Sequence, residues 1–323
     1  MSQPAPAIAD PQVVHALYGE TMGTRWRVDL VASRGVPLDP LHGVLQARLD
    51  AIVAQMSTWR DDSDLMRYSR APAGSWHALG DDFFAVMDRA LQVAEASDGA
   101  FDPAVGALVA AWGFGAHAGP RSQAPDAATL DGARRASGWR RLELRRDARE
   151  LLQPGGVRLD LSAIAKGYAV DALVAALRAR GIAAALVEVG GELRGYGRKP
   201  DGSAWRVLVE TGDDDAEPCV VALDDAAIAT SGPYWQRYDA GDRELAHTID
   251  PRSGAPVADA PAAVSVIAAD AMQADAWSTA LTVMGVEAGA AFARAHGLAA
   301  RLLPAGAGAQ PRTTAMFDAC LRP

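Results

Sequence analysis

The stretch Ala274-Asp275-Ala276-Trp277-Ser278-Thr279 lies inside an apolar segment that runs from Ala271 to Gly285. Its pattern predicts a helix, so Asp275 and Thr279, four residues apart, share one face and lie one turn apart. A carboxylate and a hydroxyl in this arrangement can bind a divalent cation, and Mg²⁺ prefers such oxygen ligands. Taken alone, the same residues have plainer roles, because a helical Thr often bonds a preceding carbonyl and an Asp near a helix start complements the helix dipole.

A second stretch, Leu159-Asp160-Leu161-Ser162-Ala163-Ile164-Ala165-Lys166-Gly167, is expected to join a strand to a helix. Asp160 stands at the end of the apolar strand, where an ionised carboxylate needs a partner. Lys166 lies one turn further on, and Ala163 could offer its carbonyl to a metal only if the helix start is distorted. A cation that faces a helix N-terminus suits a ligand that carries phosphate. The plainer alternative makes Ser162 an N-cap and Lys166 a solvated charge.

The composition limits the classes of protein and partner. The chain has 323 residues, half of them hydrophobic, which is enough for a sizeable core in one large domain or two closely joined lobes. A formal charge of −9 without a basic run argues against nucleic acid as the main partner. The two cysteines, Cys219 and Cys320, fit neither a metal-ligand spacing nor a disulfide framework.

The N-terminal residues 1–17 are expected to form a flexible segment ahead of a single domain, of one or two lobes, over residues 18–323. No run of about 18 apolar residues is present, so we expect no membrane span. The beginning of the sequence contains neither a signal peptide nor a cysteine for lipid attachment. The chain as written is therefore expected to be cytoplasmic, or periplasmic if a segment has been removed from it.

Hairpins and crossing helices together predict an α+β fold rather than a doubly wound sheet. The glycine-rich stretch from Gly190 to Gly197 does not spell G-x-G-x-x-G, so it gives little support to a dinucleotide-binding βαβ fold. The expected helices include Leu41–Met56, Asp81–Ser97, Ser162–Arg180 and Ala271–Met284. The expected strands include Val157–Leu161, Ala184–Val189, Ala262–Ala268, and a hairpin of residues 193–196 with residues 205–210.

Three further features each allow a structural and a functional interpretation. Asp102, before Pro103, can stabilise a turn or accept hydrogen bonds from the edge of a heterocycle. Gly190 and Gly191 allow a bulge or the close approach of a ligand to the backbone. His247 can be structural, or in a cleft it can take a proton from a hydroxyl nucleophile.

Several short segments follow one another in a fixed order over about residues 18–285. They are Met22-Gly23-Thr24, Met56-Ser57-Thr58-Trp59, Ala100-Phe101-Asp102, Trp112-Gly113-Phe114-Gly115, Leu159-Asp160-Leu161-Ser162 through Ala165-Lys166-Gly167-Tyr168, Val189-Gly190-Gly191-Glu192, Ala229-Thr230-Ser231-Gly232, His247 through Asp250-Pro251-Arg252-Ser253-Gly254, and Ala274-Asp275 through Thr279. Each is weak alone, but in this order the set is specific. The chain resembles the ApbE family of FAD:protein FMN transferases.

The resemblance implies mixed and antiparallel sheets packed with helices, and a cleft for FAD between lobes. It also implies an Mg²⁺-dependent enzyme that splits FAD at its pyrophosphate, attaches FMN through a phosphoester to a Thr or Ser hydroxyl of an acceptor protein, and releases AMP. Acceptors in the family are typically subunits of membrane redox complexes or other flavoproteins. Two alternatives remain: an FAD pyrophosphatase that uses water as acceptor, and a non-catalytic FAD-binding protein.

The resemblance also assigns residues. The FAD-contacting set would be Met22, Trp59, Ala100, Phe101, Asp102, Asp160, Lys166, Gly190, Gly191, His247 and Ile249. The Ala163 carbonyl, Asp275 and Thr279 would bind Mg²⁺, with Ser278 as a neighbour. His247 is the favoured general base and Asp275 the alternative, although a metal-bound carboxylate is a poorer base. Trp59 stands where the family often has Tyr, so it keeps a ring for stacking and loses the phenol's hydrogen bonds.

Overall fold

The computed structural model describes residues 11–116, 124–209, 219–232, 237–240, 243–306 and 308–321, with the backbone alone for 237–240 and 243–246. Its helices are α1 (Leu38–Met56), α2 (Asp64–Ser69), α3 (Asp81–Ala96), α4 (Gly106–Ala111), α5 (Ala127–Arg135), the 3-10 helix η1 (Trp139–Arg141), α6 (Ala165–Arg178), α7 (Ala271–Met284), α8 (Val286–Ala295) and α9 (Ala315–Asp318). Its strands are β1 (Gln12–Thr21), β2 (Thr24–Ser33), β3 (Ser75–Ala78), β4 (Leu144–Arg145), β5 (Glu150–Gln153), β6 (Ala185–Val189), β7 (Glu192–Tyr196), β8 (Trp205–Val209), β9 (Cys219–Leu223), β10 (Ala226–Ser231), β11 (Arg237–Ala240), β12 (Arg243–Ala246), β13 (Ile249–Asp250), β14 (Ala255–Pro256), β15 (Ala263–Ala268), β16 (Ala299–Leu303) and β17 (Arg312–Thr313).

One large sheet organises the molecule. Its strands lie in the order β1-β2-β6-β7-β10-β15-β16-β17, and each described pairing in it is antiparallel. The other sheets are the three-stranded β3-β5-β4 and the two-stranded β8-β9, β11-β12 and β13-β14. The expected α+β class is confirmed.

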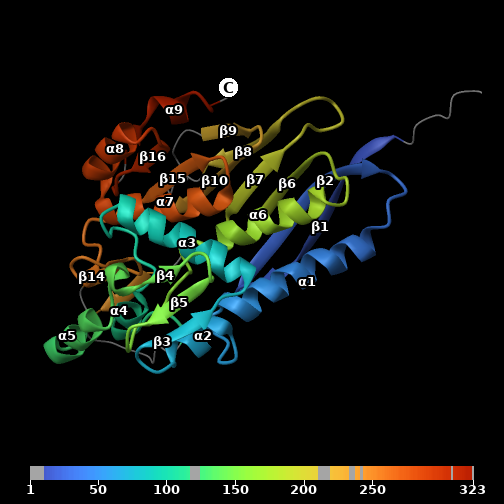
Figure 1. Cartoon of the computed structure of the whole chain (residues 1–323). Helices are drawn as coiled ribbons and strands as arrows, with labels where there is room; N and C mark the ends of the chain where they lie inside the picture. The colour runs from blue at the N-terminus through green and yellow to red at the C-terminus, as the bar shows by residue number, and fades with distance from the viewer. Residues whose placement is uncertain are drawn as a thin grey trace, which may run out of the picture.

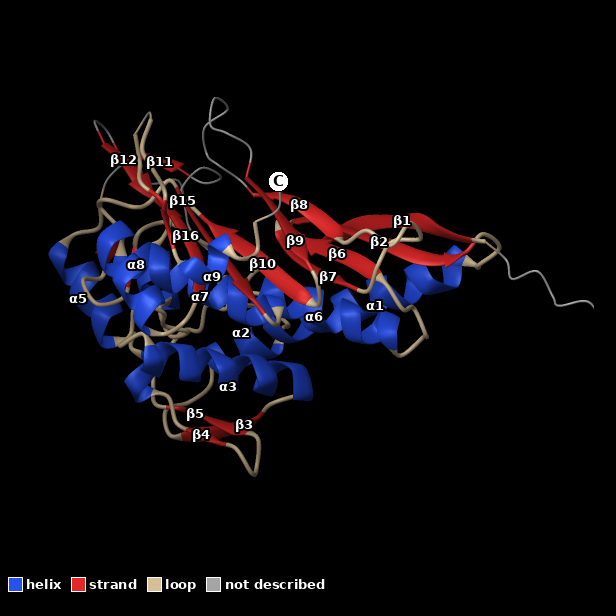
Figure 2. Cartoon of the chain, turned by 90° about the horizontal axis from the view of Figure 1, so that it is seen from above, coloured by secondary structure: helices blue, strands red, loops and turns tan. Residues whose placement is uncertain are grey.

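The elements form layers that Figures 1 and 2 show from two directions. Helices α1, α6, α7 and α8 lie along one face of the large sheet, where α6 contacts β6 and β7 and α7 contacts β10 and β15. Helix α3 packs against α1 and α7, and the β3-β5-β4 sheet lies beyond α3 (Figure 2). Helices α6 and α7 therefore lie side by side between the sheet and the outer layer.

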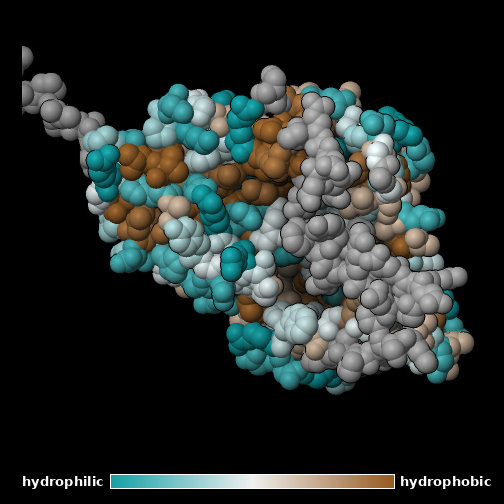
Figure 3. Space-filling view, turned by 180° about the vertical axis from the view of Figure 1, so that it is seen from behind, coloured by the Kyte–Doolittle hydropathy of each residue, from teal (hydrophilic) through white to brown (hydrophobic). Residues whose placement is uncertain are grey.

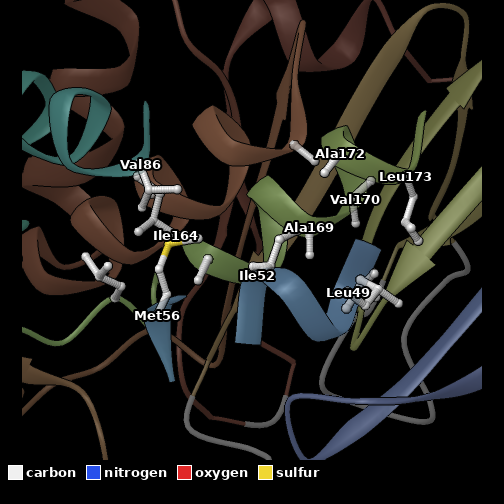
Figure 4. Packing of buried hydrophobic residues seen from close by; sticks show 14 of the residues in the cluster. Leu49, Ile52, Met56, Val86, Ile164, Ala169, Val170, Ala172 and Leu173 are labelled. Atoms are coloured by element: carbon white, nitrogen blue, oxygen red, sulfur yellow. The ribbon is translucent and has the colours of Figure 1, made fainter. Parts of the chain in front are cut away.

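The main core fills the space between these layers. Leu41, Leu45, Leu49, Ile52 and Met56 of α1 are buried in this core. Figure 4 shows Ile52 near Ala169 of α6, and Met56 next to Ile164, the residue before α6. Burying one such side chain stabilises a fold by about 1.5–3 kcal/mol. This packing fixes α6 against the sheet and so sets the position of its N-terminal turn.

The opposite face of the sheet is partly covered by the β8-β9 pair, because Leu186 and Leu193 pack against the buried cluster that contains Val207 and Val221. Figure 3 views this side and shows hydrophobic residues gathered over the β1-β2 end, where the Val14 side chain is 45% exposed. In the part of the chain that the structure describes, no helix is both long and apolar enough to span a membrane.

Two strand expectations are wrong. Residues 193–196 and 205–210 do not form a hairpin, because β7 pairs with β6 and β10, and β8 pairs instead with β9; residue 210 lies outside the described residues. Residues 157–161 alternate buried and exposed like a strand but form none, because their backbone bonds the loop after Phe101: the Asp160 amide donates to the Pro103 carbonyl at 2.9 Å.

The N-terminal boundary also differs from the expectation. Strand β1 begins at Gln12 and pairs with β2 from there, so residues 12–17 belong to the sheet. Alternating side chains on both strands and the two-residue turn at Met22 and Gly23 explain this early start. Residues 1–10 lie outside the described part of the chain.

Candidate functional site

The candidate site is built around α7, in which the Asp275 side chain is almost completely buried, at 3% exposure. Its Oδ2 accepts a hydrogen bond from the Gly167 backbone amide in α6 at 2.9 Å. A Cβ added at Gly167 would lie 2.2 Å from the Ala271 carbonyl oxygen and 2.8 Å from the Asp275 Cβ. Glycine at position 167 is therefore what lets α6 and α7 approach closely enough for this bond.

The start of α6 is distorted, as the predicted metal role of Ala163 requires. Asp160 Oδ1 accepts hydrogen bonds from the Ser162 amide at 2.9 Å and from its hydroxyl at 2.6 Å, which bends the chain before the helix. Ile164 has φ −153° and ψ −27°, outside the helical region. Helix α6 consequently begins at Ala165, later than the expected Ser162.

This distortion affects the Ala163 carbonyl. In a regular helix it would accept the amide of Gly167, four residues later, but that amide donates to Asp275. The Gly167 amide therefore does not engage the Ala163 carbonyl as a regular helix would, and on α7 Thr279 follows Asp275 by one turn. Among the described residues, no three His, Cys, Asp or Glu side chains form a metal cluster, and this mixed set of oxygens requires only one carboxylate.

Hydroxyl groups surround the Thr279 end of this set. Ser231, the last residue of β10, lies with its Oγ 3.1 Å from Thr279 Oγ1 and 2.7 Å from Ser278 Oγ. Ser278 is fully buried and donates its own proton to the Asp275 carbonyl oxygen at 2.8 Å. Strand β10 and helix α7 are therefore joined by side-chain hydrogen bonds directly at the predicted ligand residues.

A buried ion pair lies next to Asp275. Lys166 Nζ contacts Glu192 Oε1, and the Glu192 side chain is only 4% exposed. Burial raises the pKa of Glu192 to about 8, and the charge of Asp275 adds to this rise while Lys166 opposes it. Burial lowers the pKa of Lys166, but Asp275 and Glu192 raise it by more, so its net shift is upward. The lysine is held as a cation that faces two acids.

The balance of charge in this cluster fits a further cation. Burial raises the pKa of Asp275 and, to a smaller extent, Lys166 and the Gly167 amide lower it. Glu192 Oε2 is buried and has no hydrogen-bond partner among the described residues. The raised pKa values of Glu192 and Asp275 mean that burial favours their protonated forms, and a cation bound nearby would favour the ionised ones instead. The oxygens of Asp275, Thr279 and Ala163 are the donors that a hard divalent ion prefers.

Two tight turns border the cluster. Met22 and Gly23 have φ of 50° and 71° between β1 and β2, and Gly190 and Gly191 have φ of 60° and 103° between β6 and β7. The turns are adjacent, because a Cβ added at Gly190 would lie 2.7 Å from Thr24 Cγ2 and 3.3 Å from Lys166 Cδ. An open hollow of about 620 Å³ lies against residues 20–25. The predicted residues Met22, Gly190, Gly191 and Lys166 are thus brought together.

The segment around Asp102 is buried. Ala100 and Phe101 are 1% and 2% exposed, and the two Asp102 oxygens accept the backbone amides of Ala104 at 2.7 Å and Trp139 at 3.0 Å. Burial raises the pKa of Asp102 to about 6, although these two amides and Arg140 lower it. The carboxylate therefore stabilises a turn, as the plainer interpretation has it, and its contact with FAD stays a prediction.

The remaining predicted residues lie at the edges of the site. Trp59 is 73% exposed, in the loop after α1. Ile249 is buried beside α4 and α5, and His247, two residues earlier, is half-buried. The turn that follows is joined to the C-terminal half of α7, because Arg252 Nη2 donates to the Val283 carbonyl at 3.3 Å. No contact described above brings His247 or Trp59 to Asp275, so their roles stay predictions.

Other residues that shape the site escaped the sequence analysis. Glu192 was noticed only as the residue after two glycines. Asp171 was not noticed, yet its oxygens accept the Ala271 and Met272 amides at 3.0 and 2.9 Å and pair with Arg194 at 2.6 Å. The sequence pattern could have identified Asp171, because an acid four residues after Gly167 on an otherwise apolar helix face needs a buried partner.

Comparison with known proteins identifies the family of this chain. A family model described as the ApbE family matches residues 22–302, a range that includes each predicted site residue. The chain belongs to the ApbE family. Among curated relatives, this ApbE family chain is 34% identical to the FAD:protein FMN transferase of Klebsiella pneumoniae over 292 residues, covering 89% of the chain and 83% of the relative. The protein of the same name from Escherichia coli K12 is 33% identical over 306 residues, covering 93% and 87%.

Solved ApbE structures have the same fold. The flavinyl transferase ApbE of Pseudomonas stutzeri, in its apo form, is 38% identical with a TM-score of 0.88, and the alignment covers 96% of this chain and 97% of that one. The flavin transferase ApbE of Vibrio cholerae is 32% identical with a TM-score of 0.88, covering 96% and 100%. The ApbE arrangement of sheets and helices expected from the sequence is confirmed.

Proposed function

We propose that this chain is an Mg²⁺-dependent FAD:protein FMN transferase, which attaches FMN through a phosphoester to a Thr or Ser hydroxyl of an acceptor protein and releases AMP. The observation that carries the proposal is the buried Asp275 carboxylate, which accepts a hydrogen bond from the Gly167 amide at 2.9 Å in the first turn of α6. Family membership and the names of the relatives support the choice of FAD as substrate.

The metal would be held by the Asp275 carboxylate, the Thr279 hydroxyl and the Ala163 carbonyl. When bound, Mg²⁺ would neutralise negative charge that builds up on the pyrophosphate oxygens as AMP departs. Lys166 lies beside these ligands and would add a second positive charge to the same phosphates. The N-terminal turn of α6 would contribute backbone donors and the positive end of its dipole.

The flavin half of FAD would contact the two turns and the exposed aromatic ring. Trp59, at 73% exposure, has a free ring face on which a flat heterocycle can stack. The Gly190-Gly191 turn carries no side chain, so it allows a ligand to approach the backbone. Met22, Ala100, Phe101, Asp102, Asp160 and Ile249 complete the proposed set.

The transfer step exchanges one P–O bond for another. The acceptor hydroxyl oxygen attacks the phosphorus of the FMN half, a new P–O bond forms, and the bridging P–O bond breaks so that its electrons leave with AMP. We assign the hydroxyl proton to His247 as general base. Asp275 is the alternative, but its charge is already engaged by its neighbours and by the proposed metal.

The test is to incubate the protein with FAD, MgCl₂ and a candidate acceptor flavoprotein, such as a redox-complex subunit. Transfer predicts equal amounts of AMP and of an acceptor band that fluoresces on a denaturing gel, with an added mass of FMN on one Ser or Thr. AMP and free FMN without a modified band would mean an FAD pyrophosphatase. Retention of intact FAD with every acceptor and with water would contradict both enzymatic functions.

A further inference from the structure

A chain of three hydroxyl groups connects β10 to the predicted metal ligands. Ser231 Oγ lies 3.1 Å from Thr279 Oγ1 and 2.7 Å from Ser278 Oγ, and Ser278 Oγ lies 2.8 Å from the Asp275 carbonyl oxygen. Each hydroxyl has one proton to donate and lone pairs to accept with. The donor in each of these hydrogen bonds can therefore be worked out, starting from the Asp275 carbonyl.

The Asp275 carbonyl has no proton, so it can only accept a hydrogen bond. Ser278 donates its single proton there, so in its contact with Ser231 it must accept, and Ser231 must donate. Ser231 then has no second proton, so in its contact with Thr279 it must accept, and Thr279 must donate. The Thr279 proton is directed toward β10, and its lone pairs are left for another partner.

We propose that Ser231 is a positioning residue for Mg²⁺: by accepting the Thr279 proton, it turns the lone pairs of that hydroxyl toward the cation. This inference rests on the proposed function, because it takes Thr279 as a metal ligand. A neutral hydroxyl binds a cation through a lone pair, so a proton that pointed into the site would oppose binding. Outer hydrogen bonds of this kind orient metal ligands and contribute to affinity.

The surroundings hold Ser231 and its partners in place. Strand β10 pairs with β15 up to Ser231 itself, opposite Val264, and α7 packs on both strands. Ser278 is fully buried, and its carbonyl accepts the Thr282 hydroxyl at 2.8 Å. Without Ser231, Thr279 would lose its acceptor, and its hydroxyl could rotate to bond the carbonyl one turn earlier in α7 instead.

The experiment is calorimetric titration of the full chain, saturated with FAD and without acceptor, with MgCl₂. The variants are Ser231→Ala, which removes the acceptor, Ser231→Cys, which keeps a weaker one, and Ser231→Thr, which restores a hydroxyl. Ser265→Ala is the matched control, because Ser265 Oγ is a buried hydroxyl on the neighbouring strand and bonds Thr230 Oγ1 at 2.9 Å. Melting temperatures without Mg²⁺ report folding independently of the metal.

We expect Ser231→Ala to raise the Mg²⁺ dissociation constant about tenfold or more and Ser231→Cys to raise it in the same direction. Ser231→Thr and Ser265→Ala should bind Mg²⁺ like the parent, and excess Mg²⁺ should restore most of the turnover of Ser231→Ala. If Ser231→Ala does not fold, Ser231→Cys decides in its place.

The decisive variant is Ser231→Ala, or Ser231→Cys if only that one folds. If this variant binds Mg²⁺ as tightly as the parent while Asp275→Asn loses Mg²⁺ binding, the role of Ser231 is overturned and the metal site is not. Failure of the parent to bind Mg²⁺, or unchanged binding in Asp275→Asn, would overturn the metal site of the proposed function and this inference with it. The two failures are therefore distinguishable.

Discussion

At the scale of single residues, the site depends on how buried charges are compensated. Asp275 and Glu192 are almost completely buried beside the partly exposed Lys166, and a buried carboxylate without a partner is costly. The sequence marked Asp275 by its spacing from Thr279, and Lys166 by its place one turn after Asp160 at the start of a helix. It did not mark Glu192 in the same way, because the burial of a residue beside a glycine turn depends on strands and helices that come from elsewhere in the chain.

The role of His247 is tested by replacing its ring. His247→Ala should slow FMN transfer by roughly 10²–10⁴-fold, the usual contribution of a general base, while the dissociation constant for FAD stays close to that of the parent. Rapid-quench measurement of AMP release and fluorescence titration of FAD separate the two quantities. A transfer rate equal to that of the parent would remove His247 as the base.

The buried carboxyl of Asp102 makes a prediction about pH. Its pKa of about 6 lies above the value of about 4 expected in an unfolded chain, so the folded protein holds the proton more tightly. The stability contributed by this group is fully present below pH 4 and is lost as pH rises through 6. Relative to Asp102→Asn, whose amide does not titrate, the parent should lose roughly 2 kcal/mol of unfolding free energy between pH 4 and pH 7.

Urea unfolding of the parent and of Asp102→Asn at several pH values measures this difference. The amide has only one acceptor oxygen for the amides of Ala104 and Trp139, but that loss is the same at each pH. A difference in stability between the two proteins that does not change from pH 4 to pH 7 would show that burial does not control this carboxyl.

At the scale of elements, the interface of α6 with α7 determines the site. Gly167 permits the close approach, and Asp171 holds the first amides of α7 while it pairs with Arg194 of β7. The sequence predicted the bounds of α7 as Ala271–Met284 and the structure has the same bounds, because Asp270 caps the helix and Gly285 ends it. The start of α6 was placed too early, since the turn made by Asp160 is set by a side chain rather than by periodicity.

Gly167→Ala should separate these two helices. The added methyl would meet the Ala271 carbonyl oxygen, which is backbone and cannot move without the helix. We expect a loss of about 1–3 kcal/mol in unfolding free energy and weaker Mg²⁺ binding, because Asp275 would lose the Gly167 amide. Chemical denaturation and MgCl₂ titration measure the two effects.

Gly43→Ala is the matched control for this prediction. Gly43 lies inside α1, and a Cβ added there would have no atom within 4 Å among the described residues. Alanine is a better helix former than glycine, so this variant should be more stable than the parent by up to about 1 kcal/mol. Equal effects of the two substitutions would mean that the α6–α7 contact is not tight.

At the scale of the whole molecule, local patterns predicted most elements but not their partners. The α+β class, the helices and most strands follow from periodicity and turn residues. The partners of β7 do not, because a strand that follows two glycines can pair on either side. Only the complete sheet shows that β6 and β10 occupy both edges of β7, which leaves β8 to pair with β9.

The large sheet and its helix layer also explain why the site is assembled from distant parts of the chain. Two hairpin turns, the start of α6 and one face of α7 meet because β2 pairs with β6, β6 pairs with β7, and α7 covers β10, the next strand after β7. The set of motifs, taken in their order along the sequence, therefore predicted the site better than any single motif, because each motif contributes one side of a single cluster.

The central claim is that a divalent cation binds between α6 and α7. The most direct measurement is a crystal structure of the chain with FAD and Mn²⁺, which replaces Mg²⁺ and gives an anomalous signal. We expect one strong anomalous peak in contact with the Ala163 carbonyl, the Asp275 carboxylate and the Thr279 hydroxyl at about 2.0–2.3 Å, next to the FAD pyrophosphate. FAD bound without an anomalous peak at these oxygens, or with the peak elsewhere, would contradict the account.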